Sequence, residues 1–102
     1  LTTEPIKDDA LWLEANLRLQ QGEFDRTLAI CQKIVTEFPE DVLADDAYFL
    51  EGEIYDRYLN NKDKAMETYR EFLNKYPGSV YVAEARKRFR QLRGDFAETP
   101  LN

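Results

Sequence analysis

The chain of 102 residues repeats itself at an interval of 37 to 38 residues, and this repetition limits the folds open to it. The segment DDALWLEANL, which begins at Asp8, matches DDAYFLEGEI, which begins at Asp45, 37 residues later. FPEDVLADDA, from Phe38, matches YPGSVYVAEA, from Tyr76, 38 residues later. A period of this length is typical of architectures that stack units too small to bury their apolar faces alone. The change from 37 to 38 predicts one extra residue in the second repeat, near Asn60–Asn61.

Apolar side chains in both repeats recur with helical spacing. They follow the i, i+3, i+4 pattern of amphipathic helices, and no strand-like alternation is present. Gly22 and Gly94 are expected to end helices, and Pro39 and Pro77 to stop the helices before them. The expected helices cover residues about 8–21, 25–38, 42–59, 62–76 and 80–93.

These helices predict one all-α domain over residues 1–102. Its expected parts are repeat 1 at about 8–39, repeat 2 at about 42–77, a capping helix at about 80–93 and a tail at 94–102. Asp41 and Ser79 are expected as N-caps, because short polar side chains accept hydrogen bonds from the first helical N–H groups. The chain starts at Leu1 rather than Met, so we expect a piece of a longer repeat protein.

Composition excludes several classes of function. Acidic residues number 20 and basic residues 14, which gives a net charge of −6 and argues against nucleic-acid binding. The absence of histidine removes the usual general base, and the one cysteine, Cys31, is expected to be a buried, inert thiol. No apolar run approaches the roughly 20 residues needed to span a bilayer. We therefore expect a non-enzymatic protein without cofactor, metal or direct membrane insertion, whose partner is a protein or peptide.

Small residues and prolines recur at the spacing of a known repeat family. They are Ala15 and Gly52 in the first helix of each repeat, Thr27 and Ala65 in the second, and Pro39 and Pro77 at the repeat ends. In these marks the chain resembles the tetratricopeptide repeat (TPR) family. Its long turn between repeats resembles exported bacterial members, such as the Tol-Pal-associated periplasmic protein and the outer-membrane-assembly lipoprotein. The resemblance implies a right-handed superhelix of helical hairpins that binds proteins, with a periplasmic or envelope location if the likeness to exported members holds.

The resemblance also implies where a partner binds, because the first helix of each TPR hairpin, helix A, lines a concave groove. Trp12 and Phe49 lie on that side and would anchor a peptide or a partner helix. The alternative is that both rings pack between neighbouring helices. The further groove candidates are Asp9, Asn16, Asp46, Glu53 and Lys87. Most of this set is acidic, so the expected partner is basic or amphipathic, although a solvated face often has the same character.

Glu14 and Glu51 interrupt the apolar stripe at the same position in both repeats. A buried carboxylate needs a partner, and the residues four positions on are Arg18 and Tyr55. We expect both acids to be partly buried and paired, and Glu51→Leu to be neutral or mildly destabilising. The alternative is that helix A is rotated and the acids are partly solvated. The basic run at 86–93 is expected on the solvated face of the capping helix.

Three functions stay open at this point. The leading one is a protein–protein interaction or scaffolding module that holds its partner along helix A. The alternatives are a C-terminal cap or spacer of a longer repeat array with no ligand of its own, and a regulatory or assembly subunit of a bacterial envelope complex. An upstream repeat would leave part of the first helix uncovered here, including some of Leu11, Leu13 and Leu17, and exposed apolar surface predicts self-association through that flank.

Overall fold

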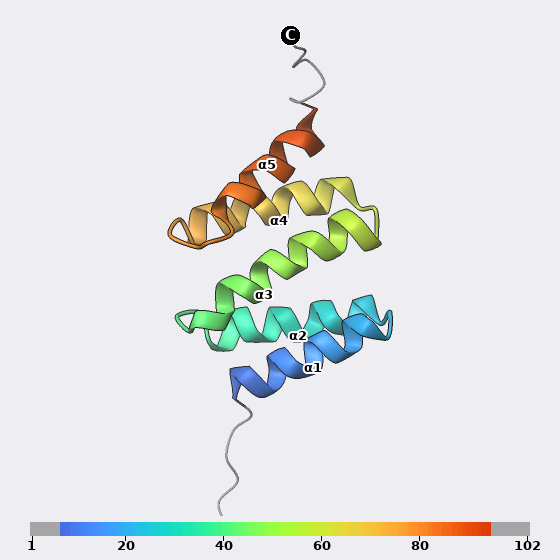
Figure 1. The fold of residues 1–102 in the computed structure, drawn as a ribbon, viewed down its shortest axis with the longest axis vertical. Coiled ribbons are helices and arrows are strands. Elements are labelled where there is room, and N and C mark those ends of the chain that lie inside the picture. The colour runs from blue at the N-terminus through green and yellow to red at the C-terminus, as the bar shows by residue number, and fades with distance from the viewer. Residues whose placement is uncertain (1–6, 95–102) are drawn as a thin grey trace, which may run out of the picture.

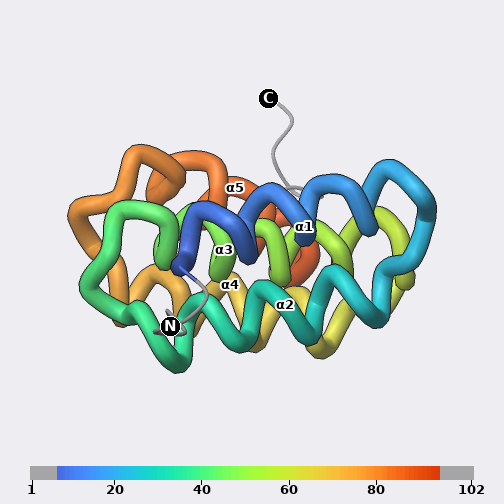
Figure 2. The backbone as a smooth tube through the Cα atoms, turned by 90° about the horizontal axis from the view of Figure 1, so that it is seen from below, coloured from blue at the N-terminus to red at the C-terminus, as the bar shows by residue number. Residues whose placement is uncertain are grey.

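The helices follow one another in a stack whose order in space is their order along the chain (Figure 1). The computed structural model describes residues 7–94. The elements are α1 (Asp8–Gln20), α2 (Phe24–Glu37), α3 (Val42–Glu53), the π-helical turn η1 (Ile54–Tyr58), α4 (Lys62–Lys75) and α5 (Val82–Arg93). Figure 2 shows α1, α3 and α5 along one side of the stack and α2 and α4 along the other. The predicted all-α fold of two helical hairpins and a closing helix is confirmed.

Two apolar clusters hold the stack together, and α3 contributes to both of them. The buried members of the first cluster are Leu11, Ala15, Leu28, Cys31, Ile34, Ala47, Leu50 and Ile54. Those of the second are Phe49, Ala65, Tyr69, Phe72 and Ala85. Close approach inside the second hairpin requires the glycine of α3, because a Cβ at Gly52 would lie 2.6 Å from Cε1 of Tyr69. The repeated small residue therefore sets how closely the two helices of a hairpin can pack.

The extra residue of the second repeat lies in η1. Leu17 and Ile54 are equivalent at an interval of 37, whereas Gly22 and Asn60, which both end a helix with positive φ (77° and 51°), are 38 apart. Between them, the Leu59 N–H donates to the Ile54 carbonyl at 2.9 Å, five residues back, which is the bond of a π-turn. The helix predicted over about 42–59 is present as far as Tyr58, but its last turn is π-helical. The predicted insertion near Asn60–Asn61 is corrected, because the widened turn absorbs the extra residue inside the helix.

The starts of α3 and α5 differ from the predicted caps. Asp41 occupies the N-cap position of α3, but its side chain makes no capping hydrogen bond. The closing helix begins at Val82 rather than at residue 80, and Ser79 lies in the turn before it. The Ser79 hydroxyl accepts from the Tyr81 N–H at 3.1 Å and donates to Asp45 at 2.6 Å. Ser79 thus ties the turn to α3 instead of capping α5. Residues 95–102 of the predicted tail lie outside the described residues.

Candidate functional site

The residues predicted to bind a partner lie on α1, α3 and α5, which form the side that we call the helix-A surface. The predicted residues are Asp9, Trp12 and Asn16 on α1, Asp46, Phe49 and Glu53 on α3, and Lys87 on α5. Asp9 and Lys87 are exposed, whereas Trp12, Asn16, Asp46 and Glu53 are half-buried. Phe49 is buried, and it is the member of the set that the structure removes from the surface.

The ring of Phe49 belongs to the second apolar cluster. It is 6% exposed and stacks on Tyr81 with a centroid distance of 4.6 Å and an interplanar angle of 7°. The chain that leads into α5 places Tyr81 there, so the expectation that Phe49 anchors a partner is corrected in favour of the core interpretation. Trp12, its equivalent in repeat 1, packs against the first cluster but is only half-buried. Trp12 is therefore the aromatic candidate that keeps part of its ring accessible.

The carboxylates of α3 give the helix-A surface its electrostatic character. Hydrogen bonding to Asp46, together with burial, raises the pKa of Tyr81 to about 12. Burial also raises the pKa of Glu53, while Arg57, whose Nε lies 3.7 Å from Glu53 Oε2, opposes the shift. On α1, the Asn16 amide donates to the Trp12 carbonyl at 2.8 Å, so it is partly used within its own helix. Asp46 and Glu53 therefore each have a partner within the chain, Tyr81 and Arg57.

One member of the basic run in α5 faces inward instead of lying on a solvated face. Arg88 donates to both carboxylate oxygens of Asp56, each at 2.8 Å, and the Asp56 side chain is only 3% exposed. The Tyr69 hydroxyl donates to the same carboxylate at 3.1 Å. Because Asp56 lies in η1, this network joins the inserted turn, α4 and the closing helix. Sequence reasoning missed it, since the two partners are 32 residues apart and the π-turn sets the direction of Asp56.

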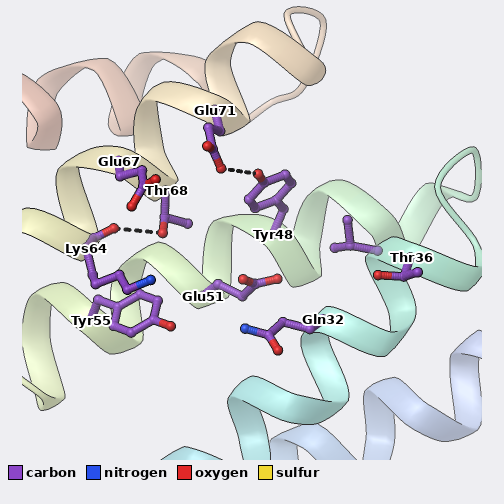
Figure 3. Close-up of a pocket in the computed structure, with 10 residues that line it drawn as sticks. Gln32, Thr36, Tyr48, Glu51, Tyr55, Lys64, Glu67, Thr68 and Glu71 are labelled. Carbon is purple, nitrogen blue, oxygen red and sulfur yellow. Dashed lines mark hydrogen bonds between the residues drawn. The ribbon is translucent and has the colours of Figure 1, made fainter.

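A second feature, also missed from the sequence, is a cleft of about 260 Å³ between the two hairpins (Figure 3). We call it the inter-hairpin cleft. Its lining comes from Gln32, Val35 and Thr36 of α2, Tyr48 and Glu51 of α3, Tyr55 of η1, and Lys64, Glu67, Thr68 and Glu71 of α4. The Tyr48 hydroxyl donates to Glu71 at 2.9 Å across it. The cleft is polar, and its acidic groups outnumber its single basic one.

Glu51 lies in the wall of this cleft and differs sharply from its counterpart in repeat 1. Glu51 is 7% exposed and makes neither a hydrogen bond nor an ion pair within residues 7–94. Burial, reinforced by the charge of Glu71, raises its pKa to about 7. The side chain of Glu14 is 48% exposed and lies 3.4 Å from Arg18. The expected pairing of Glu14 with Arg18 is present, although Glu14 is more exposed than expected. For Glu51 the expected pairing is wrong, because no described side chain bonds to it.

The remaining chemistry of the described chain is limited. Cys31 is buried as predicted, and burial, with a smaller contribution from Glu51, raises its pKa to about 12, which keeps the thiol protonated and unreactive. Across residues 7–94, no group of three or more Cys, Asp or Glu side chains is placed to hold a metal ion. No helix in the same range has the length and apolar character required to cross a bilayer.

Comparison with known proteins agrees with the repeat architecture. The family model described as Tetratricopeptide repeat matches residues 9–41 and 46–79, which together make up more than half of the chain. The first matched segment covers the hairpin α1–α2 from residue 9, and the second covers the hairpin α3–α4 from residue 46. No curated protein matches the chain. The two repeats in sequence and the two stacked hairpins in space lead to one conclusion: the chain belongs to the tetratricopeptide repeat family.

Proposed function

We propose that the chain is a non-catalytic protein-binding module that holds a basic or amphipathic segment along its helix-A surface. TPR repeats generally mediate protein–protein interaction, which supports the class of function. The observation that carries the proposal is a row of acids: Asp9, Asp46 and Glu84 occupy equivalent positions on α1, α3 and α5. Such a row favours a cationic partner through electrostatic complementarity, which accelerates encounter and fixes orientation. Trp12, half-buried beside this row, supplies an apolar anchor.

The test uses Trp12 as its own reporter, because it is the one tryptophan of the chain. A designed amphipathic peptide of leucine and lysine is titrated while the tryptophan emission is followed. We expect a saturable change that weakens as salt is raised. The double variant Asp46→Asn with Glu53→Gln should weaken binding by about tenfold, since charge-assisted contacts are lost. Asp63→Asn, an exposed acid on α4, is the matched control and should leave it unchanged. Equal weakening by both variants would reject the helix-A surface as the site.

A second candidate function, that of a spacer or cap within a longer array, is favoured by the outer face of α1. Leu13 is 63% exposed and Leu17 48% exposed, whereas their equivalents, Leu50 on α3 and Ile54 in η1, are buried in the first apolar cluster. Leu11, the third residue named from the sequence, is buried. This face would receive a helix like α2, from a preceding repeat or from a second copy. Light scattering tests the second source: the chain should associate at high concentration, and the variant Leu13→Lys with Leu17→Lys should remain monomeric. A wild-type chain that stays monomeric at the highest concentration rejects self-association.

A further inference from the structure

The inter-hairpin cleft contains a carboxylate whose burial needs an explanation. Glu51 lies between α2, α3 and α4 with only 7% of its surface exposed, and its side chain points into the open cleft rather than toward a protein donor (Figure 3). A buried charge without a hydrogen-bonding partner is among the most unfavourable arrangements in a folded chain. Its persistence at the centre of an otherwise apolar stripe is therefore a sign of a ligand.

The three equivalent helices show what is absent at Glu51. Glu14 on α1 is followed four residues later by Arg18, which lies 3.4 Å away. Phe89, the equivalent residue on α5, is followed four residues later by Arg93, whose guanidinium lies 5.1 Å from the ring centre. At Glu51 the residue four positions on is Tyr55, and no bond joins the two side chains. The middle helix thus has the more deeply buried of the two acids and lacks the arginine that the outer helices supply.

The surroundings of Glu51 favour a cation of small size. Glu67 and Glu71 of α4 line the cleft beside it, and the one basic side chain there, Lys64, forms no ion pair with any described residue. A volume of about 260 Å³ lies below the range of roughly 300–1,000 Å³ typical of pockets for drug-sized ligands. One long side chain fits such a space better than a whole small molecule. Gln32 and Thr36 of α2 add hydrogen-bonding groups along the opposite wall.

We propose that the inter-hairpin cleft receives one arginine or lysine side chain of a protein partner, with Glu51 as its counter-charge. The incoming cation takes the place that Arg18 and Arg93 occupy on the outer helices, beside the hydrogen bond between Tyr48 and Glu71. Most of the residues that line the site belong to α2 and α4. Figure 2 shows these two helices along the side of the stack opposite α1, α3 and α5. The site is therefore a second contact point, and its test is independent of the test of the helix-A surface.

The experiment titrates the intact chain with the blocked tripeptides glycyl-arginyl-glycine and glycyl-lysyl-glycine at pH 8, where Glu51 is ionised. Glycyl-citrullyl-glycine serves as the neutral isostere of the arginine peptide. Amide ¹H–¹⁵N spectra should show saturable shifts at Gln32, Tyr48 and Thr68, with dissociation constants on the order of millimolar for a single side chain. Glu51→Gln should weaken binding of the charged peptides by at least about tenfold. Glu14→Gln, the matched acid in repeat 1, should leave binding unchanged.

Four outcomes would overturn the proposal. Citrulline peptide that binds as well as arginine peptide would mean that charge is not recognised. Equal weakening by Glu14→Gln and Glu51→Gln would mean a diffuse attraction to an acidic chain. Calcium chloride that shifts the same amides at lower concentration than the peptides would assign the cleft to a metal ion. A lower melting temperature for Glu51→Gln at pH 8 would mean that a group of the chain itself, such as Lys64, already pairs with Glu51. The expected result is a raised melting temperature together with loss of peptide binding.

Discussion

The two repeats carry nearly the same residues at equivalent positions, yet the surroundings of those residues differ. Leu13 and Leu17 of α1 are exposed, and their equivalents, Leu50 of α3 and Ile54 of η1, are buried. The difference arises because α3 packs between α2 and α4, whereas α1 packs against one helix fewer. In a stacked fold, the neighbours of a repeat decide what its sequence buries. Equivalent positions therefore form matched pairs. A substitution at the buried member reports the effect of burial on stability, and the same substitution at the exposed member is its control.

The ion pairs also differ between the two repeats, because those of repeat 1 are exposed and the pair that joins repeat 2 to the closing helix is largely buried. In repeat 1, Arg18 lies 3.1 Å from Glu23 and 3.4 Å from Glu14, and all three side chains are substantially exposed. In repeat 2 and the closing helix, Arg88 holds Asp56 with two bonds in a nearly dry setting. An exposed pair contributes little, because water and salt screen it. A buried, doubly bonded pair is costly to break, because it leaves a charge without a partner.

The largest effect is expected at the paired leucines. Leu50→Ala should lower the free energy of unfolding by about 3–4 kcal/mol, because it removes buried methyl groups and leaves a cavity between α2 and α3. Leu13→Ala, at the equivalent exposed position, should change it by less than about 0.5 kcal/mol. Urea denaturation measures both values. Similar losses for the two variants would mean that α1 is covered in solution, and would favour self-association through that flank.

Next in size is the loss of the buried ion pair. Asp56→Ala should cost about 2–3 kcal/mol, somewhat less than for a fully buried pair because Arg88 is 25% exposed and can turn toward water. Glu23→Ala, which removes the 3.1 Å partner of Arg18, should cost less than about 1 kcal/mol. Hydrogen exchange of α5 adds a second measurement, because its amides should lose protection first in Asp56→Ala. Unchanged protection of α5 would mean that apolar packing alone holds the closing helix.

Local features of the fold could be predicted from the sequence, whereas features that depend on distant neighbours could not. The period, the helices and the small residues at Ala15 and Gly52 follow from spacing and from residue type. The opposite burial of Glu14 and Glu51 does not, because the segments around them are nearly identical. The bond between Asp56 and Arg88 depends on the π-turn, whose insertion the sequence places only to within a few residues. One signal for the cleft was present: Tyr55 stands where an arginine follows Glu14.

Glu51→Gln should raise the free energy of unfolding by about 2 kcal/mol at pH 8 and should change it little at pH 4. The pKa of Glu51 is raised to about 7 in the folded state, from about 4.3 in the unfolded chain. Between these values the folded state binds more protons than the unfolded state, so stability falls as pH rises through this window. Above it the full penalty of the buried charge is present, and the amide removes that penalty. For the same reason Glu51→Leu should now raise the melting temperature, contrary to the expectation from the sequence.

Thermal melts at pH 4 and pH 8 check this prediction, with Glu14→Gln as the matched variant. Glu14 is exposed, so its variant should follow the wild type at both pH values. A Glu51→Gln variant that is less stable than the wild type at pH 8 would show that the carboxylate has donors in solution, and the difference drawn here between the two acids would disappear.

The smallest effect is expected where the two helices of each hairpin cross, because the side chains at that point differ in size between the repeats. Ala15 and Cys31 in repeat 1 are replaced at equivalent positions by Gly52 and Tyr69, a smaller residue opposite a larger one. Gly52→Ala should cost about 1 kcal/mol, because the strain of pushing the Tyr69 ring, 2.6 Å from the new Cβ, exceeds the helix-propensity gain of alanine. Ala15→Gly should cost a similar amount for a different reason, the conformational freedom of glycine.

A double-mutant cycle separates the two causes. Tyr69→Phe removes the hydroxyl that bonds Asp56, so the ring can shift, and in that background the cost of Gly52→Ala should fall by half or more while that of Ala15→Gly stays the same. Equal costs of Gly52→Ala in both backgrounds would mean that the phenol does not hold the ring in place, and that the fit between Gly52 and Tyr69 is set by the helix backbones alone.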